Sequence, residues 1–199
     1  FAENAYRTEQ ELRAAMKTQE NKLYGDFRAA QKGYDVRPAL LDATDGPVTK
    51  WTAKLADPET QIDEGNIIRQ ALRAFTSDGK EWVKSVDAID KGKRALDARI
   101  YKAQQAGDTN RVRLLKGVQA DFVDVGNNVK FNDIGKKWQA AREYSSGERQ
   151  RLDALQWGRD ALKLDSNASA DQFAAFPEDQ RKLARLGILE SLTTAAGPK

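Results

Sequence analysis

The fold of this chain can be worked out from residues 86–126, which read VDAIDKGKRALDARIYKAQQAGDTNRVRLLKGVQADFVDVG. Apolar residues recur at helical spacing on both sides of Gly107-Asp108, and this pair can end one helix and cap the next. Two amphipathic helices joined by so tight a turn are predicted to pack as an antiparallel hairpin, the first running from residue 80 to residue 106. Across the turn we expect two facing rows of side chains: Ile89, Leu96, Ile100 and Ala103 against Val112, Leu115, Val118 and Phe122.

Helical periodicity extends over most of the remaining chain. Residues 2–32 are predicted to form a long helix with one narrow apolar stripe, which favours pairing with another chain or another long helix. The stripe consists of Leu12, Met16, Leu23 and Phe27. Further helices are predicted at 48–56, 59–76, 133–164, 169–175 and 178–195, with an interruption at 145–147. The last of them is expected to pack through Leu183, Leu186, Ile188 and Leu189.

These patterns predict an all-α fold, an extended bundle of long amphipathic helices and antiparallel helical hairpins. No period-2 run of apolar residues is long enough to predict a strand. Prolines and glycines between residues 33 and 58, followed by a Ser-Asp-Gly turn at 77–79, suggest two regions. Residues 1–80 would hold the long helix, a connector and short helices, and residues 81–199 the hairpin and the C-terminal helices.

The composition excludes several classes of chemistry. The 199 residues include no Cys and no His, so disulfides, thiolate metal sites and nucleophile systems that need His are excluded within this chain. The carboxylate pairs Asp87/Asp90 and Asp121/Asp124 could suggest general acid–base catalysis, but helices this rich in charge carry such pairs by chance. No apolar run approaches the ~18 residues of a membrane-spanning helix. We predict no enzymatic activity, no cofactor and no metal site.

The first residues of the chain show no targeting signal. FAENAYRTEQELRAA lacks the basic n-region and the apolar core of a signal peptide. Because the chain begins with Phe1, we expect a fragment of a longer polypeptide or a processed product. The four tryptophans are predicted to be core or helix–helix contacts instead of binding anchors. They are Trp51, Trp82, Trp138 and Trp157.

Residues 91–116 carry the most marked charge asymmetry of the chain. Eight basic side chains stand against two acidic ones, a net charge of +6 in a chain whose total is +3. Such a segment can contact DNA phosphates, or it can be a solvated face that balances acidic helices nearby. Only Tyr101 lies among the basic residues, so base stacking of single strands is poorly supported. The candidate phosphate contacts are Lys91, Lys93, Arg94, Arg99, Lys102, Arg111, Arg113 and Lys116.

Four segments between about residue 84 and residue 196 resemble helical regions of very large virion-associated, polyvalent or MuF-linked proteins of phages and prophages. The segments are KGKRALDARI at 91–100, AGDTNRVRLL at 106–115, WQAAREYSSGERQRLDALQWGRDAL at 138–162 and FAAFPEDQRKLARLGILESL at 173–192. The first 80 residues match only in general character. Members of the family often have Pro near 127–132, where this chain has NNVKFND. The family has no catalytic motif, so the resemblance implies no active-site residue.

The resemblance implies a non-enzymatic structural component of a bacteriophage particle, an internal or ejection protein that accompanies genome delivery. The implied partners are other copies of the chain, other virion proteins and, without sequence preference, DNA. The implied location is the virion and, after delivery, the host cell envelope or cytoplasm. Two alternatives stay open: a helical protein-interaction module of a host or effector protein, and the accessory region of a hydrolase whose active site lies elsewhere.

Overall fold

The computed structural model describes residues 2–163 and 166–196, and these are almost entirely helical, which confirms the all-α prediction. They fall into two compact units. The hairpin unit is Gly25–Gln139, and the terminal unit joins the residues up to Tyr24 to those from Ala140 onward. This grouping differs from the division at residue 80 that the sequence suggested. The two longest helices, α1 (Ala2–Ala30) and α7 (Ile134–Asp160), each contribute to both units.

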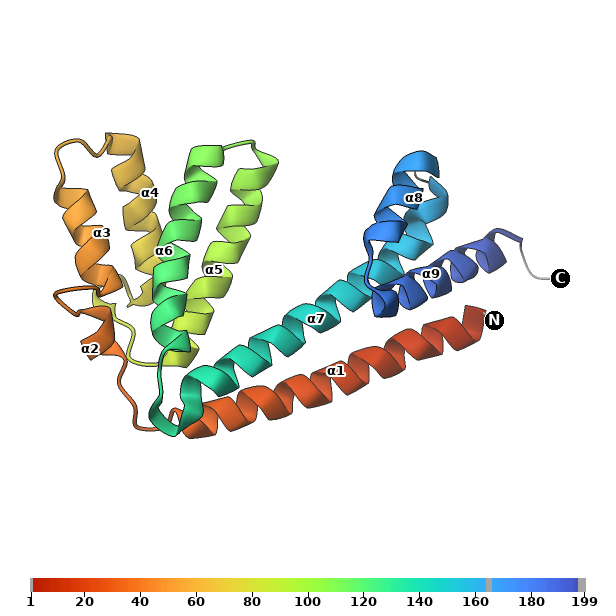
Figure 1. The fold of residues 1–199 in the computed structure, drawn as a ribbon, viewed down its shortest axis with the longest axis horizontal. Helices are drawn as coiled ribbons and strands as arrows, with labels where there is room; N and C mark the ends of the chain where they lie inside the picture. Colours follow the sequence, from red (N-terminus) through yellow and green to blue (C-terminus); the bar gives the residue numbers. More distant parts are fainter. Residues whose placement is uncertain (1, 164–165, 197–199) are drawn as a thin grey trace. The chain divides into compact units, whose positions relative to one another are not determined.

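The predicted hairpin is the centre of the hairpin unit. Figure 1 shows α5 (Val86–Gln105) and α6 (Thr109–Asn127) side by side, joined by a short connection. Gly107 adopts a φ of +70°, a conformation that favours glycine, and the Asp108 carboxylate accepts the backbone N–H of Arg111 at 2.9 Å. The predicted stop and cap are therefore confirmed.

The predicted start of the first hairpin helix at residue 80 is wrong. Thr76–Ser77 (β1) pairs with Glu81–Trp82 (β2) as a small antiparallel hairpin, and α5 begins only after it. Asp78 and Gly79, with φ of 51° and 73°, form its turn. Asp-Gly is a strong signal for such a turn, because both positions need positive φ. Strands of two residues carry no period-2 pattern, and the all-α fold class is unaffected by them.

The two facing rows of the α5–α6 hairpin are buried as predicted, except that Val112 is half-buried. The Phe122 ring stacks on Phe75 with centroids 4.0 Å apart and 7° between the planes. Phe75 ends a 3₁₀ turn, η1 (Arg73–Phe75), that docks on α5 at Gly92. A Cβ at Gly92 would lie 2.6 Å from the Ala74 carbonyl oxygen and from the Phe75 ring, so only glycine fits this contact.

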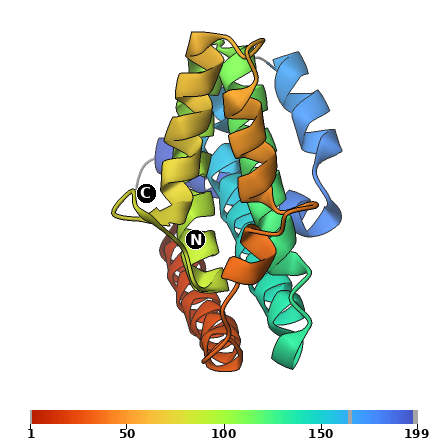
Figure 2. The same cartoon turned by 90° about the vertical axis from the view of Figure 1, so that its left-hand side faces the viewer.

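Three further helices cover the hairpin. The helices α3 (Pro47–Ala56) and α4 (Ile62–Leu72) lie against α6, and Figure 2 shows both in front of it. The short helix α2 (Arg37–Leu40) precedes them. Residues 59–61 are not helical, so the helix predicted from residue 59 starts three residues later.

Trp138, near the start of α7, joins four helices of the hairpin unit. Its indole N–H donates to the buried Asp90 carboxylate of α5 at 3.0 Å, and its ring stacks with Phe27 of α1 at 6.5 Å. A Cβ at Gly126 of α6 would lie 2.2 Å from the indole ring, so this position requires glycine. Phe27, at the end of the predicted apolar stripe, thus packs against a long helix of its own chain. The 3₁₀ turn η2 (Phe131–Asp133) leads into α7.

In the terminal unit α1, α7 and α9 (Glu178–Ala196) are joined by Arg159 of α7, which pairs with Glu9 and Glu190. The helix α7 is continuous through residues 145–147, so the predicted interruption is wrong. Ser145 is buried there and donates to Glu20 of α1 at 2.8 Å.

The last two helices also differ from the prediction. After a 3₁₀ turn, η3 (Ala161–Lys163), the helix α8 spans Ser166–Ala175, so Ser169 lies inside it and does not cap it. The end of the helix predicted at 133–164 lies outside the described residues. On α9 the buried positions are Ala184 and Gly187, whereas Leu189 is 52% exposed. Small residues let the backbones of α7 and α9 approach closely, and a Cβ at Gly187 would lie 2.2 Å from the Leu155 carbonyl oxygen.

Replacing Phe122 with Ala should lower the free energy of unfolding by roughly 3–5 kcal/mol, because the truncated side chain leaves a cavity against Phe75. Urea denaturation followed by circular dichroism measures the loss. Tyr101→Ala is the matched control, since this aromatic side chain of α5 is 62% exposed and its loss should stay within about 0.5 kcal/mol. Equal losses for the two variants would contradict the buried position of Phe122.

Candidate nucleic-acid interface

The eight basic residues predicted as phosphate contacts all lie on the α5–α6 hairpin, five on α5 and three on α6. The structure divides them into two sets according to their partners. Four form ion pairs with carboxylates of the same chain, and we call them the compensated set. The pairs are Lys91–Asp87 at 2.9 Å, Lys93–Asp97 at 2.6 Å, Arg94–Asp90 at 2.7 Å and Arg113–Glu64 at 3.1 Å.

Two of the carboxylates that pair with the compensated set are held by more than one partner. Burial raises the pKa of Asp87, but the hydrogen bonds and charges of Lys91 and Arg28 outweigh it and bring the pKa below its usual value. Asp90 is 4% exposed, pairs with Arg94 and also accepts the Trp138 indole N–H. The basic residues paired with such carboxylates add little net positive charge to the surface, because each cation faces a fixed anion.

The other four basic residues, Arg99, Lys102, Arg111 and Lys116, form the uncompensated set. None of them pairs with a carboxylate in the part of the chain that the structure describes. Arg99 and Arg111 instead donate to Gln70 of α4, a neutral residue that the sequence analysis did not single out. The net charge of the hairpin is therefore concentrated in the half that lies toward the Gly107 turn.

Three members of the uncompensated set line a hollow of about 300 Å³ at this end of the hairpin. Arg99 and Lys102 come from the last two turns of α5, and Arg111 comes from the first turn of α6. The hollow also contains Asp108, whose carboxylate caps α6. The complete lining is Arg99, Lys102, Ala103, Ala106, Asp108 and Arg111.

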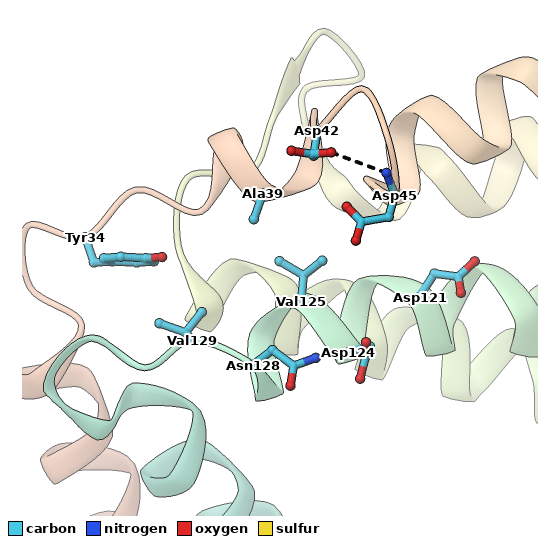
Figure 3. A pocket seen from close by; sticks show the side chains of 9 residues that line it. All are labelled: Tyr34, Ala39, Asp42, Asp45, Asp121, Asp124, Val125, Asn128 and Val129. Carbon is cyan, nitrogen blue, oxygen red and sulfur yellow. Dashed lines mark hydrogen bonds between the residues drawn. The ribbon is translucent and has the colours of Figure 1, made fainter.

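A second hollow, of about 310 Å³, is acidic and lies where the connector after α2 passes the end of α6 (Figure 3). The Asp42 carboxylate accepts backbone N–H groups of Thr44 and Asp45, which lowers its pKa. Asp121 accepts the Trp51 indole N–H at 2.7 Å and pairs with Lys50 at 2.8 Å. The hollow is lined by Tyr34, Ala39, Asp42, Asp45, Asp121, Asp124, Val125, Asn128 and Val129.

Three of the four carboxylates considered in the sequence thus make structural contacts, and Asp124 is exposed in the acidic hollow. Asp87 and Asp90 hold Lys91, Arg94 and Trp138, and Asp121 fixes α3 to α6. No group of three or more potential metal ligands occurs among the described residues. Over the same residues, no helix has the length and apolar character needed to cross a membrane.

The tryptophans lie mostly as predicted. Trp51 and Trp138 are buried, and both donate their indole N–H to an aspartate. Trp82 is half-buried with its ring 6.1 Å from Phe122, and Trp157 is half-buried against Phe173 and Phe176. All four make contacts between elements of the fold.

Comparisons of this chain with protein-family models, with curated proteins and with solved structures return no match. The arrangement of the side chains on the hairpin is therefore the structural basis for proposing a DNA contact.

Replacing Arg94 with Gln should lower the free energy of unfolding by roughly 1–3 kcal/mol, because the buried Asp90 loses its charged donor. Lys91→Gln removes the same charge one turn away, but Asp87 keeps Arg28 at 3.1 Å, so the loss should stay within about 0.5 kcal/mol. Thermal and urea unfolding compare the two variants. A larger loss for Lys91→Gln would contradict the assignment of Asp90 as the buried carboxylate that needs its partner.

Proposed function

We propose that the chain is a non-enzymatic structural component of a bacteriophage particle, an internal or ejection-type protein that accompanies delivery of the genome. In this role it contacts DNA through backbone phosphates at the end of the α5–α6 hairpin. The resemblance of residues 84–196 to phage virion-associated proteins motivates the phage assignment. The location that follows is the virion and, after delivery, the host cell envelope or cytoplasm.

The observation that carries the DNA contact is the uncompensated set. A solvated basic face would be expected to find carboxylates throughout, as Lys91, Lys93 and Arg113 do. Among the described residues, the uncompensated set has no such partners, and its members lie on adjacent turns of two packed helices. Cations that no carboxylate of the chain neutralises can replace the counterions of a nucleic acid, and the released counterions drive binding.

Phosphate contacts of this kind carry no sequence information, because every nucleotide presents the same phosphate. A protein that travels with a packaged genome must bind wherever it meets the duplex, so contacts to the backbone suit it. The hairpin exposes only Tyr101 as a large aromatic side chain near the basic residues, which favours duplex over stacked single strands.

A helical protein-interaction module is the second candidate, and the exposed leucines of α9 favour it. Leu189 and Leu192 are 52% and 48% exposed. Apolar side chains at this exposure support contacts with other copies of the chain or with other proteins. A virion component needs such contacts too, so the discriminating property is DNA binding. The hydrolase alternative would require an active site outside this chain.

The wild-type chain should bind random-sequence duplex DNA at about 50 mM salt and weaken steeply toward about 200 mM. Changing Arg99, Lys102 and Arg111 to Gln should flatten the log–log salt dependence by about 0.9 for each phosphate that the variant no longer neutralises. The control triple Lys91→Gln, Lys93→Gln and Arg113→Gln removes the same charge from ion-paired positions and should flatten it less. Fluorescence anisotropy measures both. Absence of wild-type binding at the lower salt concentration would overturn the DNA contact.

The virion role has a direct test of its own. Mass spectrometry of particles purified from a phage that encodes this chain should find its peptides in full particles. After ejection of the genome in vitro, an ejection protein should be depleted from the emptied particles relative to the major capsid protein. Peptides absent from full particles would contradict the virion role and favour the interaction module.

A further inference from the structure

We propose that the hollow at the end of the α5–α6 hairpin is a preformed phosphate-binding site, and that Gln70 is the residue that positions its arginines. The inference rests on the proposed function in taking a DNA backbone phosphate as the natural occupant. The chemistry that the site recognises is the phosphate group itself, so a free phosphate could occupy it as well.

The charge of the hollow favours an anion. Arg99, Lys102 and Arg111 bring three cations to one concave surface, and Asp108 is the single carboxylate among the described residues that line it. The Asp108 carboxylate already accepts the Arg111 backbone N–H at 2.9 Å, so it serves the helix cap. Three cations lining one hollow repel one another unless an anion lies between them, which a phosphate would provide.

Gln70 holds two of these cations without neutralising them. Its backbone carbonyl oxygen accepts Arg99 Nη1 at 2.6 Å, and its side-chain Oε1 accepts Arg111 Nη2 at 2.9 Å. A guanidinium has five N–H donors, so each arginine keeps donors for a ligand. One residue of α4 thereby fixes an arginine of α5 and an arginine of α6, while both retain their full charge.

The compensated set differs from these two arginines in the charge of the groups that hold its cations. A few residues away, Asp97 and Glu64 hold Lys93 and Arg113 and cancel their charge. At Gln70 an uncharged amide takes the place that a carboxylate takes in those pairs. An arginine that is already held in place loses less side-chain entropy when the ligand binds. The planar guanidinium also presents its donors at a spacing that matches two phosphate oxygens.

The test exchanges the amide of Gln70 for a carboxylate of the same shape. Gln70→Glu keeps an acceptor for Arg111 but cancels its charge. Gln172→Glu makes the same charge change at an exposed position of α8, in the terminal unit, and is the matched control. Two titrations are measured for each protein. Inorganic phosphate is followed by the arginine Nε–Hε resonances in NMR spectra, and a random-sequence duplex is followed by anisotropy over a range of salt concentrations.

The wild type and Gln172→Glu should show saturable shifts at Arg99 and Arg111 with phosphate, whereas Gln70→Glu should lose them with its melting temperature unchanged. The duplex salt slope should become shallower by about 0.9 in Gln70→Glu, and by less in the control. If phosphate shifts appear but the duplex does not bind, the site binds free phosphate. This result would contradict the proposed DNA contact and leave the phosphate site standing. If the duplex binds equally to both variants and no phosphate shift appears, the site is overturned while the DNA function stands.

Discussion

The stacking of Phe75 on Phe122 is the contact on which the arrangement of the hairpin unit depends. It fixes the end of α4 to both helices of the hairpin, because Phe75 follows α4 directly and lies over Gly92 of α5. Gly92 has no Cβ, and this lets η1 approach the α5 backbone closely enough for the rings to meet. With α4 fixed in this way, Gln70 lies within hydrogen-bond distance of Arg99 and Arg111. The buried aromatic contact thus determines the geometry of charged side chains at the surface.

The fold also decides which cations are available at the surface. At the far end of α5, Trp138 brings Asp90 into the core, and Asp90 in turn requires Arg94. Arg94 therefore serves the stability of the fold even though its side chain is half-exposed. Toward the Gly107 turn, Arg99 and Arg111 donate instead to the two carbonyl oxygens of Gln70, which carry no net charge. The +6 of the segment is distributed unevenly for this structural reason.

The hairpin was predictable from sequence because periodicity, a glycine stop and an aspartate cap all indicated the same turn at Gly107. The break at residues 76–82 was missed because two-residue strands carry no periodic pattern, although Asp78-Gly79 is a recognised turn signal. The α7–α9 crossing was missed for another reason. In a sequence, Gly158 and Gly187 only weaken the helical pattern. In the fold, they let the backbones of α7 and α9 approach closely.

The site was predictable only in part. Composition identified the eight basic residues, but their division into two sets depends on partners far away in sequence, such as Glu64 for Arg113. Gln70 could not be found at all, because a glutamine on a polar helix face has no distinguishing signal until its neighbours in space are known. Charge counts predict where a basic segment is, and the fold determines how much of that charge is available.

The half of the hairpin toward Gly107 is the part proposed to contact DNA. Backbone ¹H–¹⁵N spectra recorded during titration with a short random-sequence duplex locate the contact residue by residue. Amide shifts should concentrate at residues 99–116, around the turn, and on α4 near Gln70. Shifts centred on Lys91, Lys93 and Arg94, or spread over the terminal unit, would contradict this contact.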